Sequence, residues 1–500
     1  MQDPLYGSIF VSMVLHVECF PMSVTADASV DVPLCVDLDG TLVLVDTFQE
    51  ACVLLLKQHF FHIFLIPFWI LRGKSYLKER VNSYIEHDVT TLPVHAGFLQ
   101  FLQEQKANGR RLILVTAAPF SVAHEVATHL QYFDDVIAST ERENVKGRRK
   151  AEVLLDRFGY RGFDYAGNSH ADLAVWKVAR RAILVQPSLG VCRRLGADII
   201  VDRVFQKTSS SPMSFLRSLR LHQLVKNLLI FIPILSSHTI FEPSSVQKGM
   251  LAFASFSACT SAVYLFNDLF DIGADRRHSK KRHRPLASGS LTIPLALCGA
   301  IALMTVGIGL AWQLSLLFVY AILCYLILTT LYTSVIKKIP MTDVVVLSLL
   351  YTSRILAGNI ATGISFSFWL LTFSIFFFLS LACLKRYTEL LWFLDEGASS
   401  IPGRGYNVQD VSLLQMIGIA SGMSSILILG LYIDSQRATL LYHHPSMLWI
   451  SPVLTLYWLM RMWFLAHRRQ MDVDPILFAV KDAMSYFIGI LIVFLTVLAI

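Results

Sequence analysis

Two carboxylates separated by a single residue follow a short apolar run near the start of the chain. The run 34–36 leads directly into Asp37 and Asp39, and Gly40 comes next. If the run is a strand of an open parallel sheet, both acids lie beyond its carboxyl end, where such sheets bind ligands. There they can hold Mg²⁺ while one acid attacks phosphorus and the other transfers a proton. An Asx turn would use the same residues, so this motif alone leaves both interpretations open.

Further polar residues follow later apolar runs in the same part of the chain. The run 112–115 ends at Thr116, whose hydroxyl could bind a phosphate oxygen, and Lys150 opens a helical stretch. Asn168 and Asp172 follow another strand-like run. All four side chains suit a site that holds a phosphate and a metal ion, so they favour the functional interpretation.

The positions of these residues depend on the fold of the first 200 or so residues. Short β-rich runs alternate there with helical stretches, which is typical of a parallel α/β sheet. We therefore expect a Rossmann-like α/β domain over residues 31–205, after a tail at 1–30 and before a linker at 206–218.

In this order, the four motifs resemble those of the haloacid dehalogenase-like phosphatase family. The resemblance implies that Asp37 is the nucleophile that accepts the phosphoryl group and that Asp39 is the general acid and base. It also implies that Thr116 and Lys150 hold the phosphate. Lys150 is preferred over Lys146 because it directly opens the helix.

The resemblance also implies a Mg²⁺ site, and here the sequence departs from the family. The ligands would be Asp37, the backbone carbonyl of Asp39, and the fourth motif with Asn168 and Asp172. The family usually has Asp where this chain has Asn168. An amide oxygen can coordinate Mg²⁺ but carries no charge, so we expect weaker metal binding, which Asp172 could offset.

The rest of the chain has the composition of a membrane protein. Of all 500 residues, 54% are hydrophobic and 16% charged, and the mean hydropathy is +0.55, which excludes a purely soluble enzyme and a disordered chain. Apolar runs long enough to cross a hydrocarbon core recur from Leu219 onward. We expect residues 219–500 to form an all-α polytopic membrane domain of about nine transmembrane helices. Their expected centres are near Ile230, Ser257, Ala302, Ala321, Leu350, Ile375, Ser421, Leu456 and Val493.

The run from Ala51 to Leu71 is a further candidate span. Lys57, His59, His62 and Pro67 interrupt it, so we expect a buried or interfacial helix instead.

The distribution of basic residues predicts the orientation in the membrane. These residues crowd the connections after the second, fourth, sixth and eighth expected spans. The positive-inside rule then places those connections and the α/β domain on the cytoplasmic side of the cell inner membrane, with the C-terminus on the opposite side. The net charge of +7 suits anionic lipid headgroups and phosphorylated substrates. We expect the lipid bilayer as a partner, and no nucleic acid.

Acidic residues at helical spacing end the second expected span. Asp268, Asp271 and Asp275 follow Asn267 at offsets of three and four, which place the acids on one stripe of a helix. Such a stripe suits Mg²⁺ bound to a diphosphate. The bases that follow could neutralise phosphate oxygens, although a solvated loop is the alternative for them. They are Arg276, Arg277, Lys280, Lys281, Arg282 and Arg284.

The string NDLFDIGADRRHSKKRHRPLASG resembles the first aspartate-rich motif of the UbiA-type membrane prenyltransferase superfamily, whose helical fold agrees with the expected spans. Arg220, His222, Gln223, Lys226 and Asn227 at the first span look like the branch that makes polyprenyl-phosphoryl phosphoribose. Later strings look like the same branch. They contain Lys338, Pro340, Asp343, Arg354 and Gly358, then Lys385, Arg386 and Glu389, and finally DPILFAVKD at Asp474 to Asp482.

The resemblance implies transfer of a phosphoribosyl group from phosphoribosyl diphosphate to a polyprenyl phosphate. Mg²⁺ held by Asp268, Asp271 and Asp275 would stabilise the departing diphosphate. The other candidate residues would bind substrate, although polar packing between helices is the alternative. They are Lys226, Asn227, Asn267, Lys281, Arg282, Arg284, Asp343, Arg354, Lys385, Arg386 and Glu389.

Two other functions are left open by the sequence. One is a prenyltransferase that moves an isoprenyl chain from a diphosphate to an aromatic acceptor. The other is a transporter or scaffold with an inactive soluble module.

Overall fold

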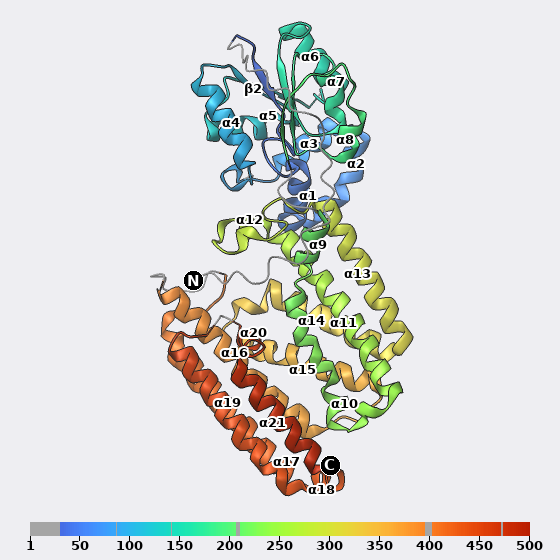
Figure 1. Ribbon diagram of the computed structural model, residues 1–500, viewed down its shortest axis with the longest axis vertical. Helices are drawn as coiled ribbons and strands as arrows, with labels where there is room; N and C mark the ends of the chain where they lie inside the picture. The colour runs from blue at the N-terminus through green and yellow to red at the C-terminus, as the bar shows by residue number, and fades with distance from the viewer. Residues whose placement is uncertain (1–30, 87, 142, 207–210, 396–402, 472–473) are drawn as a thin grey trace. The chain divides into compact units, whose positions relative to one another are not determined.

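The computed structural model describes residues 31–86, 88–141, 143–206, 211–395, 403–471 and 474–500, and Figure 1 shows its elements. The expected tail at residues 1–30 and part of the expected linker lie outside them. The chain divides into two compact units. The first unit runs to Ser218 and includes Phe266–Ala296, and the second unit consists of Leu219–Leu265 and Leu297–Ile500.

A parallel sheet of six strands forms the centre of the first unit, as the alternating pattern predicts. The strands are β1 (Leu34–Val36), β2 (Leu112–Pro119), β3 (Asp135–Ser139), β4 (Asp164–Gly167), β5 (Ala182–Val185) and β6 (Val201–Phe205). Their order is β3-β2-β1-β4-β5-β6, and all neighbours are parallel. From β1 the chain runs to β2 and β3 on one side, and it then crosses to β4 on the other side of β1. The residues that follow β1, β2 and β4 therefore meet at one edge, at the point where the strand order reverses.

Helices cover both faces of this sheet. On one face, Leu34 and Val36 pack with Phe98 of α4 (Ala96–Ala107) and Val126 of α5 (Phe120–Leu130). The opposite face is covered by α6 (Arg148–Phe158), α7 (Leu173–Trp176) and α8 (Leu189–Arg194). Because both faces are covered, β1, β4 and β5 are buried along their whole length. β1 and β5 are apolar throughout, whereas β4 begins with Asp164, which pairs with Arg110 and Arg180.

The connection between β1 and β2 contains an additional small helical region. It consists of α1 (Thr47–Gln58), η1 (Phe60–Leu65), α2 (Ile66–Leu71), α3 (Lys74–Ser83) and η2 (Val89–Thr91). Ala51, Leu55, Trp69 and Val81 form its own core. The run from Ala51 to Leu71 is thus broken near His59 and is not a single helix that could span a membrane. The expected burial holds only for its first part: Ala51 and Leu55 of α1 are buried, whereas η1 has no buried residue and α2 buries only Trp69.

Long helices make up the second unit. The elements that follow β6 in the chain include α9 (Ser211–Ser218), which belongs to the first unit, and then η4 (Leu221–Phe231), α10 (Ile232–Ser236), η5 (Thr239–Phe241), α11 (Pro243–Phe270), α13 (Ile293–Leu314), α14 (Leu316–Ser334), η7 (Ile336–Lys338), α15 (Thr342–Thr362), α16 (Phe368–Asp395), η8 (Val408–Asp410), α17 (Val411–Ile433), α18 (Gln436–Leu441), η9 (Pro445–Trp449), α19 (Ile450–His467), α20 (Pro475–Ala479) and α21 (Ala483–Ala499). The central helix α15 packs against η4, α10, α14 and α16. Gly358 of α15 permits the contact with η4, because a Cβ atom there would lie 2.2 Å from the carbonyl oxygen of Ile230.

The helices identify the chain as a multi-pass membrane protein. Within the described residues, seven helices are long and apolar enough to cross a membrane, and the bent pair Pro212–Ser218 and Leu221–Ser236 would make eight. Eight of the nine expected centres lie in the seven long helices or in the bent pair. The ninth, Val493, lies in the shorter helix α21, so a count of nine spans requires that α21 also crosses. With 17 residues, α21 is about 25 Å long, which is at the lower limit for a span.

Candidate functional site

The first candidate site lies at the carboxyl end of β1. The backbone N–H of Asp37 donates to the carbonyl oxygen of Ala166 in β4, at 3.0 Å. Gly40 has a φ of +73°, and a Cβ atom there would lie 2.1 Å from Nδ2 of Asn168. Glycine is therefore required both by the backbone and by the packing of the Asn168 amide against this loop. The first and fourth sequence motifs are thus neighbours in the structure.

A buried lysine contacts the predicted nucleophile. Nζ of Lys150 donates to Oδ1 of Asp37 at 2.7 Å, to the hydroxyl of Tyr165 at 2.9 Å and to the carbonyl oxygen of Val115 at 3.1 Å. The ammonium group has hydrogen-bond partners in three directions, which a buried charge requires. The structure thus brings Lys150 to Asp37, while Lys146 lines the same cavity from an exposed position.

Asp172 has a different environment from the one expected of a metal ligand. Its Oδ2 accepts hydrogen bonds from the backbone N–H of Asn168 and of Ser169 and from the Ser169 hydroxyl, at 3.2, 2.9 and 2.7 Å. Its Oδ1 accepts from the Tyr165 hydroxyl at 2.8 Å. These bonds fix the loop that carries Asn168. Asp172 is therefore better suited to position the loop than to replace the missing charge at Asn168.

Thr116 is also placed differently from a residue that binds substrate. It is fully buried, and its Oγ1 accepts a hydrogen bond from the N–H of Ala118 at 3.0 Å. The neighbouring Ala117 lines the cavity instead. Nζ of Lys78 donates to the carbonyl oxygen of Ala117 at 2.6 Å. Lys78 is thus a second cation beside the site, and no motif in the sequence pointed to it.

Burial changes the acidity of both acids of the first motif. It raises the pKa of Asp37 to about 6, against the opposing effect of the Lys150 charge. Burial, together with the charge of Asp46, raises the pKa of Asp39 to about 7, although the N–H of Thr47 donates to its Oδ1 at 2.8 Å. A carboxyl group with a pKa near neutrality can both give and take a proton, which suits Asp39 for acid–base chemistry.

Both acids open into a cavity of about 760 Å³ within the first unit. Lys74, Lys78, Lys146 and Lys150 contribute positive charge to its lining. A different part of the lining is apolar and comes from residues 286–294, which follow the aspartate-rich motif.

The oxygen atoms at this site fit Mg²⁺. Within the part of the chain that the structure describes, no three His, Cys, Asp or Glu side chains lie close enough together to bind a metal ion. The donors at the site are instead two acids and an amide, all of which offer the oxygen ligands that Mg²⁺ prefers. The raised pKa values of Asp37 and Asp39 are consistent with a place for a cation, because a bound cation would stabilise both carboxylates.

The aspartate-rich motif is broken between two helices. Asp271 lies at the junction of α11 and α12 (Ile272–Arg277), so the single helical stripe expected from the sequence is interrupted there. Asp268 and Asp275 are both buried and accept hydrogen bonds from Nη1 of Arg284, at 3.2 and 2.6 Å. Asp271 is half exposed and lies 3.5 Å from Nζ of Lys57.

The other expected substrate-binding residues of this loop have different exposures. Lys281 and Arg282 lie on η6 (Lys281–His283) and are exposed, while Asn267 is half-buried. Arg284, also predicted to bind substrate, contacts Asp268 and Asp275.

A second candidate site lies inside the second unit. Nζ of Lys226 in η4 and Nζ of Lys385 in α16 both donate to Oδ2 of Asp474, at 2.7 and 3.0 Å. Although burial alone would raise it, these two ammonium groups hold the pKa of Asp474 well below its usual range. Two cations on one carboxylate leave an excess of positive charge, which suits a phosphate. The sequence string DPILFAVKD contained Asp474, but the sequence did not indicate its contact with the two lysines.

Other predicted residues of the second unit belong to polar contacts between helices. Arg386 in α16 contacts both carboxylate oxygens of Asp343 in α15, and it donates to Glu389 at 2.8 Å and to the Tyr332 hydroxyl at 2.7 Å. These side chains satisfy one another, as expected for polar packing between membrane helices.

Arg354 and Asn227 form a similar group. Nε of Arg354 donates to Oδ1 of Asn227 at 3.1 Å, and Nη2 donates to the Tyr325 hydroxyl at 2.9 Å. The Asn227 amide donates in turn to Ser257 and Thr260, at 3.1 and 3.2 Å. This group fixes η4, and therefore Lys226, against α11, α14 and α15.

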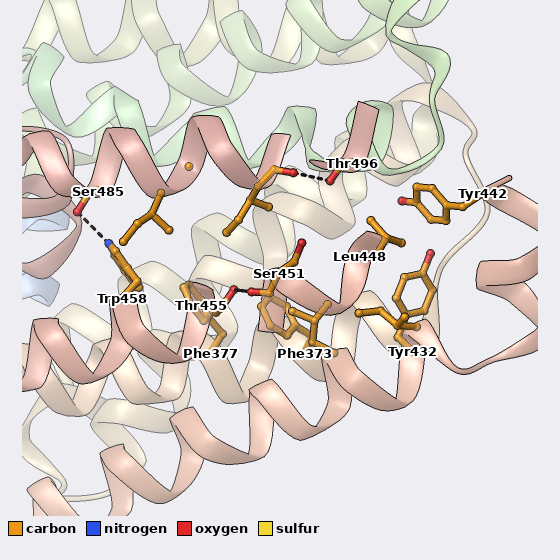
Figure 2. A pocket seen from close by; sticks show the side chains of 15 residues that line it. Phe373, Phe377, Tyr432, Tyr442, Leu448, Ser451, Thr455, Trp458, Ser485 and Thr496 are labelled. Carbon is orange, nitrogen blue, oxygen red and sulfur yellow. Dashed lines mark hydrogen bonds between the residues drawn. The ribbon is translucent and has the colours of Figure 1, made fainter. Parts of the chain in front are cut away.

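The second unit also contains an apolar cavity of about 380 Å³ among α16, α17, α19 and α21 (Figure 2). The indole of Trp458 donates to Ser485 at 2.8 Å, and the Thr455 hydroxyl donates to the carbonyl oxygen of Ser451 at 2.8 Å. Among the described residues, those that line it include no carboxylate, lysine, arginine or histidine. The cavity therefore suits a hydrocarbon chain rather than a reaction that involves phosphates.

The arrangement of buried acids and lysines within long helices agrees with a comparison to known families. The UbiA prenyltransferase family profile matches residues 230–488, which is more than half of the chain. The chain belongs to the UbiA prenyltransferase family. The haloacid dehalogenase-like hydrolase profile matches residues 34–177. This UbiA family protein therefore carries a haloacid dehalogenase-like domain at its N-terminal side, as the sequence motifs predict.

Several curated relatives resemble this UbiA family protein. The uncharacterized protein y4nM of Sinorhizobium fredii is 36% identical over 486 residues, which cover 96% of this chain and 92% of that protein. The nodulation protein NoeC of Azorhizobium caulinodans is 33% identical over 276 residues, covering 55% of this chain and 89% of NoeC. The decaprenyl-phosphate phosphoribosyltransferase of Corynebacterium glutamicum is 35% identical over 187 residues, covering 37% of this chain and 56% of that enzyme.

Solved structures resemble each part of the protein at low sequence identity. A UbiA homologue from Archaeoglobus fulgidus bound to GPP and Mg²⁺ is 18% identical, with a TM-score of 0.42, and covers 56% of this chain and 99% of its own. A phosphoserine phosphatase in its apo form is 16% identical, with a TM-score of 0.27, and covers 37% of this chain and 98% of its own.

Proposed function

We propose that the membrane domain transfers a phosphoribosyl group from phosphoribosyl diphosphate to a polyprenyl phosphate. The observation that carries this proposal is the pair of lysines, Lys226 and Lys385, on the single carboxylate of Asp474. An excess of positive charge inside an apolar domain suits the phosphate headgroup of a lipid acceptor, whereas an aromatic acceptor would not need it. The similarity to a decaprenyl-phosphate phosphoribosyltransferase supports the same reaction.

The reaction breaks the bond between C1 of the ribose and the diphosphate, and forms a bond from C1 to a phosphate oxygen of the lipid. Asp268 and Asp275, which both contact Arg284, would hold Mg²⁺, which when bound neutralises the departing diphosphate. Arg284 would turn toward the diphosphate when these acids bind the metal. Lys226 and Lys385 would orient the lipid phosphate. This phosphate is already anionic, so no strong base is needed.

We infer further that the haloacid dehalogenase-like domain hydrolyses a phosphate monoester, such as the 5-phosphate of a ribose. Asp37 would attack phosphorus, and Asp39 would protonate the departing alcohol oxygen. Asp39 would then remove a proton from the water that releases the phosphate from Asp37. Lys150 holds Asp37 in place, and Lys78 and Lys150 provide positive charge beside the phosphate. The two active regions would both face the cytoplasm, because basic connections are retained on that side.

An assay of the full-length protein in detergent would test the transfer. Labelled phosphoribosyl diphosphate and polyprenyl phosphate are supplied with Mg²⁺, and the label is followed into the lipid extract. We expect label in the lipid only when Mg²⁺ and polyprenyl phosphate are both present. Transfer of an isoprenyl chain to an aromatic acceptor, without phosphoribosyl transfer, would instead support the alternative prenyltransferase function.

A further inference from the structure

The loop that follows the aspartate-rich motif is attached to the haloacid dehalogenase-like domain by a buried ion pair. The guanidinium of Arg276 contacts both carboxylate oxygens of Glu50 in α1, with 2.9 Å between Nη1 and Oε2. Only 6% of the Arg276 side chain and 8% of the Glu50 side chain are exposed. Nε of Arg276 also donates to the carbonyl oxygen of Ala287, at 2.9 Å. A paired contact of this kind fixes the position of the loop on α1.

This attachment makes the loop a wall of the phosphatase cavity. Leu286 and Leu291 are buried and line the cavity, and Ile293 lines it from a half-buried position. Gly289 is packed so closely that a Cβ atom there would lie 2.8 Å from Cβ of Leu44. The loop is therefore tightly packed against the residues that follow the first motif.

The cavity lining combines charged and apolar residues. Asp37, Asp39 and Lys150 provide charges at the edge of the sheet. The apolar side chains are Leu44, Phe48, Ile70, Leu286, Leu291 and Ile293, and Gln49 and Lys74 line the cavity as well. A volume of about 760 Å³ is in the range of pockets that enclose an organic ligand rather than a phosphate alone. A small polar phosphate ester would leave the apolar side chains wet, which costs free energy.

The apolar lining extends to the protein surface at Ile70. This residue of α2 lines the cavity and is 54% exposed. Phe61, Phe64, Phe68 and Leu71 of the same segment, η1 and α2, are exposed as well. Exposed apolar residues in this number are unusual for a surface in contact with water only, and they mark a binding surface for apolar groups.

We propose that this cavity takes a phosphate monoester carried by an apolar, lipid-like group. Its phosphate lies at Asp37 and Lys150, and its apolar group lies between residues 286–294 and Ile70. This inference rests on the proposed phosphatase function of the domain and adds the class of substrate. The product of the proposed transfer belongs to this class, so the loop that carries the diphosphate-binding acids would also help to bind the product.

A matched pair of substrates tests the proposal on the full-length protein in detergent with Mg²⁺. Dodecyl ribofuranoside 5-phosphate and methyl ribofuranoside 5-phosphate share the phosphate and the sugar and differ only in the alkyl chain. We expect kcat/KM to be at least about tenfold higher for the dodecyl ester, because burying only two CH₂ groups would supply that factor.

Two isoleucine variants test whether Ile70 binds the alkyl chain of the substrate. Ile70→Ser should lower the ratio of the two kcat/KM values by about fivefold, since it removes apolar surface from the cavity. Ile200→Ser is the matched control, because Ile200 is also 54% exposed in the first unit and does not line the cavity. Circular dichroism and gel filtration establish that each variant is folded.

The outcomes separate this inference from the proposed phosphatase function. Equal kcat/KM values for the two esters would overturn the lipid-like substrate class and leave the phosphatase function standing. Hydrolysis of neither ester would overturn both. If Ile70→Ser kept the full preference, as Ile200→Ser should, the detergent and not the cavity would cause the preference, and the inference would be overturned. An equal loss in the two variants would also overturn it, because Ile200 does not line the cavity.

Discussion

Arg276, which directly follows the aspartate-rich motif of the UbiA family domain, contacts both carboxylate oxygens of Glu50 in the haloacid dehalogenase-like domain. The two residues are 226 positions apart in the sequence. The loop that follows the aspartate-rich motif belongs to the same compact unit as the cavity beside Asp37, and this contact holds it there. A change at the Arg276–Glu50 pair should therefore affect the stability of the first unit and both proposed activities.

Replacing Arg276 tests this connection. Arg276→Gln leaves the Glu50 carboxylate buried without a cation, so we expect the first unit to lose about 3 kcal/mol of stability. Arg277→Gln is the control, because Arg277 pairs with Asp88 while 66% of its side chain is exposed, and exposed pairs contribute about 0–1 kcal/mol. Denaturant unfolding of the full-length protein, followed by tryptophan fluorescence, measures both. Equal losses in the two variants would contradict the special role of the buried pair.

The nucleophile assignment predicts the effect of a conservative change at Asp37. Asp37→Asn should abolish Mg²⁺-dependent hydrolysis of phosphate monoesters, because an amide cannot attack phosphorus. The folded structure should be retained, since the side chain keeps its size. Asp134→Asn serves as the control, because Asp134 lies in a surface ion pair with Lys106. Full hydrolysis by Asp37→Asn would exclude Asp37 as the nucleophile.

The raised pKa values predict how Mg²⁺ activation depends on pH. Burial raises the pKa of Asp37 to about 6 and that of Asp39 to about 7, so below these values a metal ion must displace protons. The Mg²⁺ concentration for half-maximal hydrolysis should therefore fall as pH rises from about 5.5 to about 7.5, and level off above that range. Titrations of activity with MgCl₂ at several pH values measure it, and a constant value would contradict the prediction.

Replacing the Asn168 amide with a carboxylate tests whether this residue binds the metal ion. Asn168→Asp adds the carboxylate that the family usually has, so we expect the Mg²⁺ requirement at neutral pH to fall by roughly tenfold. If Asn168→Asp left the requirement unchanged, Asn168 would not be a metal ligand.

The candidate residues that the structure brings together as expected lie at the ends of parallel strands. Asp37 and Asn168 follow β1 and β4, and the apolar runs identified both strands, so their proximity follows from the topology. Lys150 meets Asp37 for the same reason, since its helix begins beside the carboxyl end of the sheet.

The sequence could not predict contacts that depend on side-chain direction or on distant segments. Thr116 follows the expected strand, but its hydroxyl binds the backbone of Ala118. Asp474 meets Lys226 across 248 positions, and no periodicity relates them. The helix break at Asp271 has no proline beside it, and Gly273 is the one weak signal near it in the sequence, so the single acidic stripe was the simpler expectation.

The membrane topology is a prediction that the two ends of the chain can test. If the bent pair and α21 both cross the membrane with the seven longer helices, the haloacid dehalogenase-like domain and the C-terminus lie on opposite sides. Reporter fusions that are active on one side only should then give opposite signals at the two ends. Equal signals would mean that one of the two marginal elements, the bent pair or α21, does not cross.

Variants of Asp268 and Lys385 separate the proposed donor site from the proposed acceptor site. Asp268→Ala should lose nearly all phosphoribosyl transfer, because the charge of the departing diphosphate is then poorly neutralised. Lys385→Met should mainly raise the KM for polyprenyl phosphate, by about tenfold, since a lost charged hydrogen bond costs about 1.5 kcal/mol or more. Lys248→Met is the control, because Lys248 is an exposed lysine of α11 outside both proposed sites. Initial rates of label incorporation, with each substrate varied in turn, measure the two effects. A raised KM for phosphoribosyl diphosphate alone in Lys385→Met would move Lys385 from the acceptor site to the donor site.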